Sequence, residues 1–208
     1  MKNRKKITLL LCAALAANML LAGCSSQQNP SPAAAEPSDK PSESNGAVSD
    51  ELPAVQGSLQ SFSATALDGS SFTQDDIAAK DITMINFWSL TCRPCIAEMP
   101  DLAAFAKALP DNVQLITVCL DGILDEEITK SILDEAGYEG ITLIAGDGDF
   151  QTVCANIQYT PTTILVDTEG NLVGNAIVGG KEDLSGAFLP EINAALKASG
   201  KAEIHLET

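Results

Sequence analysis

Two cysteines at C-x-x-C spacing, Cys92 and Cys95, are the residues of this 208-residue chain best placed to do chemistry. A dithiol of this spacing can exchange with other disulfides when one sulfur is ionised. Three other uses compete: half of a zinc site, an inert structural disulfide, or two buried thiols. The chain has no second C-x-x-C and no H-x-x-x-H to complete a tetrahedral site, and its only histidine, His205, stands alone near the C-terminus. We therefore interpret the pair as redox-active and expect no metal and no cofactor.

The segments around the pair predict that it lies where a buried strand meets a helix. Residues 82–88 are mostly apolar, which predicts the strand. Apolar residues after the pair recur at helical spacing: Met99, Leu102, Ala103, Ala106 and Leu109. A thiolate at the N-terminus of such a helix faces unpaired N–H groups and the positive end of the helix dipole, and both lower its pKa. This placement favours a reactive dithiol over an inert one.

Strand and helix patterns alternate through the rest of the folded part, which we expect from residue 52 onwards. The predicted strands cover residues 62–66, 71–73, 82–88, 113–120, 141–145, 163–167 and 172–178. The predicted helices cover about residues 94–109, 126–136, 150–157 and 182–198. Asp125 should cap the second helix and Gly137 should end it. Pro190 should break the last helix in two. This alternation predicts an α/β fold with helices on both faces of the sheet.

Several motif residues carry a resemblance to a known family. They are Phe87-Trp88, Cys92-Arg93-Pro94-Cys95, Glu98, Pro100 and Tyr159-Thr160-Pro161-Thr162. This pattern resembles thiol-disulfide oxidoreductases of the TlpA/ResA type. The resemblance implies a thioredoxin-like fold, with a central mixed sheet flanked by helices and an N-terminal β-hairpin. It also implies that Pro161 is cis, so that the backbone of Thr160 lies beside Cys92 and docks a peptide as an extra strand. The residues alone leave a plain turn open as well.

The resemblance assigns roles within the C-x-x-C motif. Cys92 should be the exposed attacking thiolate, and Cys95, one helical turn in, should be the resolving thiol. Pro94 pre-sets a helical φ in the first turn, where its missing N–H is not needed. Arg93 either lowers the pKa of Cys92 through its charge or is simply solvated, and both interpretations stay open.

Glu98 follows Cys95 by three residues, and two interpretations of it compete. If it is buried, its pKa is raised and it can accept the proton of Cys95, which is the role that the family gives this glutamate. Alternatively it is a first-turn acid that favours the helix dipole. Asn86 stands where cytoplasmic thioredoxins carry a buried aspartate, which leaves Glu98 as the candidate acid–base group. Thr91 replaces the tryptophan that usually precedes the first cysteine, so the aromatic platform beside the dithiol is altered.

Two further cysteines, Cys119 and Cys154, fall in apolar segments and should pack as small hydrophobic residues. A disulfide between them requires Cα atoms within about 7 Å, which the sequence does not decide.

The N-terminal segment has the pattern of an export signal. A basic stretch, residues 1–6, precedes an apolar stretch of 16 residues, residues 7–22. The segment ends in Leu-Ala-Gly-Cys24, which resembles the lipobox of bacterial lipoproteins and implies that Cys24 is lipidated. A transmembrane anchor would need roughly 20 apolar residues. An ordinary signal peptide leaves Cys24 without a role.

We therefore expect a lipoprotein signal peptide at residues 1–23 and a lipid-anchored linker at residues 24–51. The linker carries four prolines among Ser, Gln, Asn and Ala and should be disordered, because it cannot bury enough apolar surface to offset its loss of entropy. Residues 52–208 should form the thioredoxin-like domain.

Charge and resemblance together define the expected function. The formal charge of −16 argues against nucleic acid, which requires clustered basic residues. The resemblance implies a membrane-anchored, extracytoplasmic reductant of disulfides in exported proteins, such as apo-cytochrome c or a methionine sulfoxide reductase. It also implies a membrane electron donor of the CcdA/DsbD type. The alternative is a non-catalytic binding module that uses the Thr160–Pro161 edge and holds Cys92–Cys95 as a static disulfide.

Overall fold

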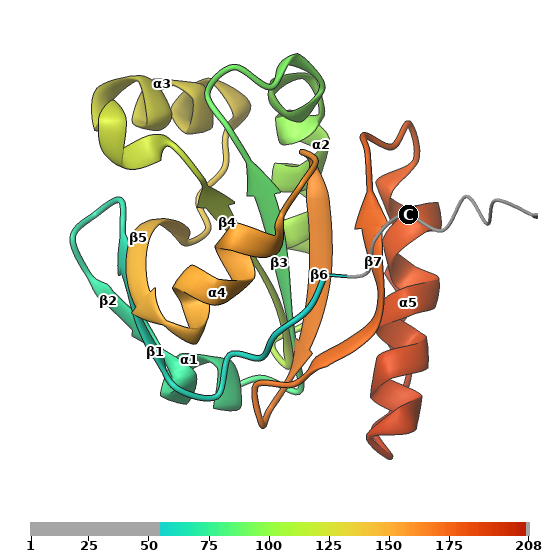
Figure 1. The fold of residues 1–208 in the computed structure, drawn as a ribbon. Coiled ribbons are helices and arrows are strands. Elements are labelled where there is room, and N and C mark those ends of the chain that lie inside the picture. Colours follow the sequence, from blue (N-terminus) through green and yellow to red (C-terminus); the bar gives the residue numbers. More distant parts are fainter. Residues whose placement is uncertain (1–54, 207–208) are drawn as a thin grey trace, which may run out of the picture. The chain divides into compact units, whose positions relative to one another are not determined.

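A computed structural model describes residues 55–206, and the strands within this part form one mixed sheet (Figure 1). The strands are β1 (Phe62–Ala66), β2 (Ser71–Thr73), β3 (Ile82–Trp88), β4 (Val113–Cys119), β5 (Thr142–Gly148), β6 (Thr162–Asp167) and β7 (Leu172–Val178). Their order in the sheet is β2-β1-β5-β4-β3-β6-β7. The pairs β3–β4 and β4–β5 are parallel and the others are antiparallel. The fold is thioredoxin-like, with the predicted N-terminal hairpin.

Helices cover both faces of the sheet. They are α1 (Gln74–Ala78), α2 (Arg93–Ala108), the 3-10 helix η1 (Gly122–Leu124), α3 (Glu126–Ala136), α4 (Asp149–Asn156) and α5 (Leu184–Ala198). One core joins buried residues of α2, α3 and α5 to the sheet, and a second joins those of α1 and α4 to its other face. Figure 1 shows α4 in front of the sheet and α2 behind it.

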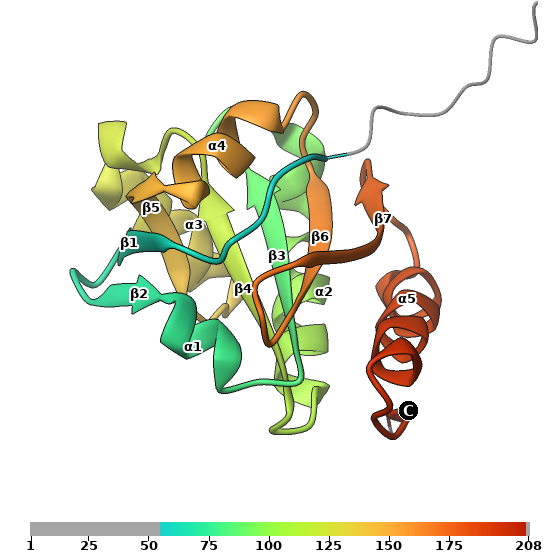
Figure 2. The same cartoon turned by 60° about the horizontal axis from the view of Figure 1, so that its bottom comes forward.

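Strand β3 is the centre of the structure. All seven of its residues are buried, and it lies between β4 and β6 (Figure 2). Met84 and Trp88 point into one core, whereas Ile85 and Phe87 point into the other. This alternation is the period of two that a strand imposes. A strand buried on both faces is apolar throughout, which is why its sequence reads as a continuous hydrophobic run.

Most predicted elements are confirmed within a few residues. Asp125 caps α3, since its Oδ1 accepts a hydrogen bond from the N–H of Ile128 at 3.0 Å. Gly137 ends α3 with a left-handed φ of 70°. The sequence did not predict α1, because five residues give too short a pattern to detect. Strand β5 runs three residues further than predicted, to Gly148, because it pairs there with β1.

The predicted break at Pro190 is wrong. Helix α5 continues through Pro190 without interruption. The ring of Pro190 is exposed, and so is Gly186, whose carbonyl would otherwise accept the missing hydrogen bond. The buried stripe that includes Phe188 and Ile192 continues on the opposite side of the helix. Packing of that stripe therefore holds the helix together across a local defect that water can satisfy.

The predicted signal peptide, Cys24 and the linker lie outside the described residues. Within residues 55–206, no helix combines the length and the apolar character needed to cross a membrane.

Candidate active site at the Cys92–Cys95 disulfide

Cys92 and Cys95 form a disulfide at the junction between β3 and α2. The sulfur atoms are 2.03 Å apart and the Cα atoms 5.3 Å apart. Cys92 is the N-cap residue of α2, and its Sγ accepts a hydrogen bond from the backbone N–H of Cys95 at 3.3 Å. The predicted strand-to-helix position is therefore confirmed. A thiolate of Cys92 at this position is stabilised by the helix N-terminus.

The two cysteines differ in accessibility. Cys92 is 9% exposed and Cys95 is 1% exposed, so Cys92 is the one that a partner can reach. In the oxidised pair it is nevertheless less exposed than we expected, since its sulfur is directed towards Cys95. The side chains of Arg93 and Pro94 lie outside, in contact with solvent. Arg93 forms no ion pair with any residue of the described part of the chain.

The Thr160–Pro161 peptide bond is cis, as the resemblance implied. Pro161 precedes β6, whose first residue, Thr162, is paired with Phe87 of β3. Because Phe87 is followed at once by Trp88 and the dithiol loop, this register places the cis-proline turn beside the end of β3. No hydrogen bond among residues 55–206 uses the backbone N–H or C=O of Thr160. These groups can pair with an extended peptide.

Glu98 is the one charged side chain in the described part of the chain that is buried, at 8% exposure. Burial raises its pKa, and the nearby carboxylate of Asp101 adds to the rise; the N–H and the charge of Lys181 oppose it. The interpretation of Glu98 as a first-turn acid is wrong, because the first turn of α2 contains no acidic residue. Asn86 is also buried, and its Nδ2 donates to Thr163 Oγ1 at 2.9 Å.

A short loop between β7 and α5 connects the cis-proline to Glu98, and sequence reasoning missed it. The N–H of Gly179 donates to the carbonyl of Pro161 at 2.8 Å. The N–H of Lys181 donates to Glu98 Oε2 at 3.1 Å. A Cβ on Gly180, between them, would approach Glu98 Oε2 to 3.3 Å. The Gly-Gly pair after a predicted strand was the only signal for this loop, and such a pair usually indicates no more than a turn.

Asp121 is a second missed residue. Its Oδ1 accepts a hydrogen bond from the N–H of Leu90 at 2.9 Å, and Leu90 lies two residues before Cys92. Asp121 therefore fixes the loop that leads into the dithiol. The signal for it was its place just after a strand parallel to β3, since neighbouring parallel strands end at the same edge of a sheet.

Cys119 and Cys154 are both free, so the disulfide left open between them is absent. Burial raises the pKa of each thiol to about 12; for Cys119, the carboxylate of Asp121 adds to this rise. Thiols with such pKa values carry almost no thiolate near neutral pH and are unreactive. The packing role expected for these cysteines fits these surroundings.

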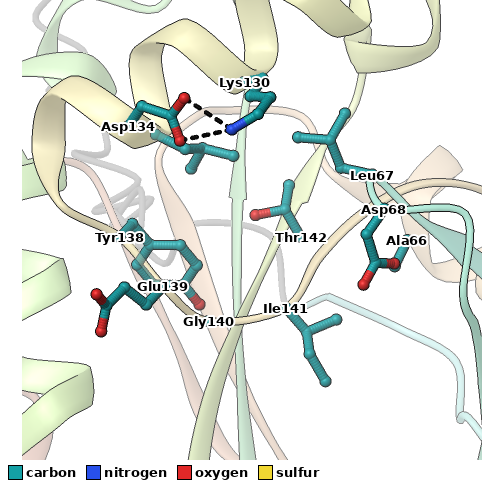
Figure 3. Close-up of a pocket in the computed structure, with 11 residues that line it drawn as sticks. Ala66, Leu67, Asp68, Lys130, Asp134, Tyr138, Glu139, Gly140, Ile141 and Thr142 are labelled. Carbon is teal, nitrogen blue, oxygen red and sulfur yellow. Dashed lines mark hydrogen bonds and ion pairs between the residues drawn. The ribbon is translucent and has the colours of Figure 1, made fainter.

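A pocket of about 440 Å³ lies away from the dithiol, between α3 and the start of β5 (Figure 3). Its residues belong to segments 66–68 and 130–142 and do not include Cys92 or Cys95. Its cation, Lys130, is already paired with both carboxylate oxygens of Asp134, at 2.7 and 2.8 Å. The pocket therefore offers no free positive charge to an anionic ligand.

Fold and site define the class: a thioredoxin-like protein-disulfide oxidoreductase with a C-x-x-C disulfide. Residues 47–194 match the Redoxin family model, and the chain belongs to the Redoxin family. The chain is 27% identical to thioredoxin-like protein YneN of Bacillus subtilis over 52% of the chain and 63% of the relative. It is 28% identical to thiol-disulfide oxidoreductase ResA of Bacillus thuringiensis, over 60% of the chain and 71% of the relative.

A solved structure supports the fold. A secreted disulfide oxidoreductase of Mycobacterium tuberculosis aligns with a TM-score of 0.50 and 23% identity, over 67% of this chain and 96% of that one. The fold expected from the motif residues is thus confirmed by the sheet topology and by this likeness.

Replacing Glu98 by Gln should change the pH dependence of stability in the oxidised protein. Because burial raises the pKa of Glu98 above its ordinary 4.5, the folded state holds this proton more tightly than the unfolded state does. The carboxyl therefore destabilises the fold as pH rises through this range. We expect Glu98→Gln to gain stability relative to the unaltered protein between pH 4 and pH 7, measured by urea unfolding at each pH. Glu135→Gln, at an exposed position on α3, is the control and should show no such trend. If the free energies of unfolding of Glu98→Gln and of the unaltered protein differ by the same amount at pH 4 and at pH 7, the raised pKa of Glu98 is contradicted.

Proposed function

We propose that this protein is a membrane-anchored, extracytoplasmic thiol-disulfide oxidoreductase that reduces disulfides in exported client proteins. The observation that supports this most is the Cys92–Cys95 disulfide at the N-terminus of α2, with cis-Pro161 on the adjoining strand. A helix N-terminus stabilises an attacking thiolate, and an edge with free backbone groups can hold an extended client.

The reaction begins from the reduced dithiol. The Cys92 thiolate attacks one sulfur of a client disulfide, the client's S–S bond breaks, and a mixed disulfide forms between Cys92 and the client. Cys95 then attacks Cys92, which releases the second client sulfur as a thiolate that takes up a proton. Two electrons pass to the client, and the protein is left with the Cys92–Cys95 disulfide. The backbone of Thr160 aligns the client strand during both steps.

Glu98 acts as the acid–base group for Cys95 in this proposal. Resolution requires Cys95 to lose a proton, and a buried carboxyl on the same helix, whose pKa burial raises, is suited to accept it. The Glu98→Gln variant tests this role as well. Thiol alkylation rates of the reduced protein should change their pH dependence, with client reduction falling about 10²-fold or more. Superimposable pH–rate profiles would exclude the role.

The direction of electron flow and the partners are inferred from the TlpA/ResA resemblance. Proteins of that type usually reduce, so apo-cytochrome c or a methionine sulfoxide reductase is the expected kind of client. A membrane donor of the CcdA/DsbD type would return the Cys92–Cys95 disulfide to the dithiol. The competing proposal is a binding module with a static disulfide, which the low exposure of Cys92 favours.

The two cysteines should behave differently when each is replaced by serine. Cys95→Ser removes the resolving thiol, so mixed disulfides between Cys92 and clients should accumulate and disappear on treatment with dithiothreitol. Cys92→Ser removes the attacking thiol and should trap no client. Non-reducing gels of cell extracts measure both. Cys119→Ser is the matched control and should trap nothing, because it removes only a buried thiol and keeps Cys95 to resolve the mixed disulfide. If only Cys92→Ser accumulates mixed disulfides, the roles of attacking and resolving thiol are reversed. If neither variant accumulates them, the static disulfide is favoured.

The proposed domain organisation places the lipid anchor on Cys24 and residues 24–51 between anchor and domain. Cys24→Ala should release the protein from membranes or leave an uncleaved precursor, because the lipidated residue is lost. Fractionation followed by mass determination of the N-terminus measures this outcome. Cys12→Ala, within the apolar stretch, is the control and should remain anchored. A Cys24→Ala protein that is processed normally and stays on the membrane would contradict the anchor.

A further inference from the structure

Three large apolar side chains are exposed together at the start of the connection from β4 to α3. Ile123, Leu124 and Ile128 are 57%, 82% and 50% exposed, and we call them the η1 patch. Within residues 55–206, the only other large hydrophobic residues that are exposed are Ile141 and Tyr159. Single exposed apolar residues are ordinary, but a cluster within six positions indicates a surface for interaction.

The η1 patch lies at the same edge of the sheet as the dithiol. Strands β3 and β4 are parallel, and Trp88 is paired with Cys119, so the two strands end side by side. Figure 1 shows both strands ending below the starts of α2 and α3. The hydrogen bond from Leu90 to Asp121 ties the loop before Cys92 to the loop before η1. The patch is therefore held at a fixed place relative to the reacting sulfur.

A protein client that reaches Cys92 must also cover the surface around it. A standard interface buries about 800 Å² on each partner, which corresponds to a disc of roughly 16 Å radius. The η1 patch begins two residues after Asp121 and so falls within reach of such a footprint. A small disulfide such as oxidised glutathione would touch only the dithiol.

The charges around the η1 patch indicate which segment of a client fits it. Asp125, Glu126 and Glu127 lie among its apolar residues, and none of them forms an ion pair within the described part of the chain. These carboxylates disfavour an anionic lipid surface and favour a partner with basic residues.

We propose that the η1 patch is a specificity surface for the dithiol. It receives an apolar segment with Lys or Arg beside it, from the same client polypeptide whose disulfide reacts with Cys92. This inference rests on the proposed reductase function and adds to it the chemistry of the preferred client.

The test measures second-order rate constants for reduction of three substrates by the reduced full chain. Two synthetic peptides of equal length each contain one disulfide, flanked by Leu and Arg in one and by Ser and Asp in the other; the third substrate is oxidised glutathione. The unaltered protein should prefer the Leu/Arg peptide. The double variant Ile123→Ser/Leu124→Ser should reduce that peptide about tenfold more slowly, because an interface hot spot is lost. Its rate with oxidised glutathione should stay within about twofold of that of the unaltered protein.

Ile141→Ser is the matched control. Ile141 is exposed but lies just before β5, where its carbonyl accepts a hydrogen bond from the N–H of Thr117 within β4, outside the connection from β4 to α3. The variant should behave as the unaltered protein does. Equal rates for both peptides, or an equal loss towards glutathione disulfide, would overturn the inference. A third outcome would also overturn the inference: the unaltered protein forms dimers, the double variant does not, and both reduce the peptides at the same rates. The occupant of the η1 patch would then be a second copy of the chain. An unaltered protein that reduces none of the three substrates would instead contradict the proposed reductase function.

Discussion

The start of α2 is the constraint on which the rest of the site depends. Strand β3 is buried along its whole length and lies between β4 and β6. The loop that follows β3 therefore starts α2, with Cys92 at its N-cap, in the interior of the sheet's edge. There the N–H of Cys95 meets the sulfur of Cys92. The neighbours of β3 then supply the remaining parts from their own ends: Pro161 from the β6 side and Asp121 from the β4 side. The site is thus assembled by the register of three adjacent strands.

Location, rather than residue type, separates the reactive cysteines from the inert ones. Cys119 lies one strand away from the dithiol, but it is buried beside a carboxylate, and its pKa is raised to about 12. Cys92 lies at a helix N-terminus, where the dipole and free N–H groups favour the thiolate. The same reasoning applies to Glu98: it is buried on α2 with Lys181 as its hydrogen-bond donor, and burial dominates the shift of its pKa.

The sequence predicted those features of the fold and the site that interactions between residues close together in the chain determine. The buried strand, the caps of α3 and the dithiol at the strand–helix junction follow from periodicity, capping and spacing, and the structure confirms them. The cis bond at Pro161 needed the family resemblance, because sequence alone leaves cis and trans prolines open. Pro190 was misjudged because a buried stripe, which is a tertiary effect, outweighs a local helix defect. The contacts of Lys181 with Glu98 span 83 positions along the chain, and no local signal reports such a pairing.

The central claim is that Cys92–Cys95 is a redox couple that donates electrons. Its reduction potential tests this most directly, measured on the purified protein by equilibration with defined ratios of reduced and oxidised dithiothreitol or glutathione. A donor of electrons to exported proteins should have a potential near that of thioredoxin, about −270 mV, and Cys92 and Cys95 should be the residues alkylated after reduction. A potential near that of DsbA, about −120 mV, would make the protein an oxidant. A reduction potential below about −300 mV would indicate a structural disulfide. Either result would contradict the account.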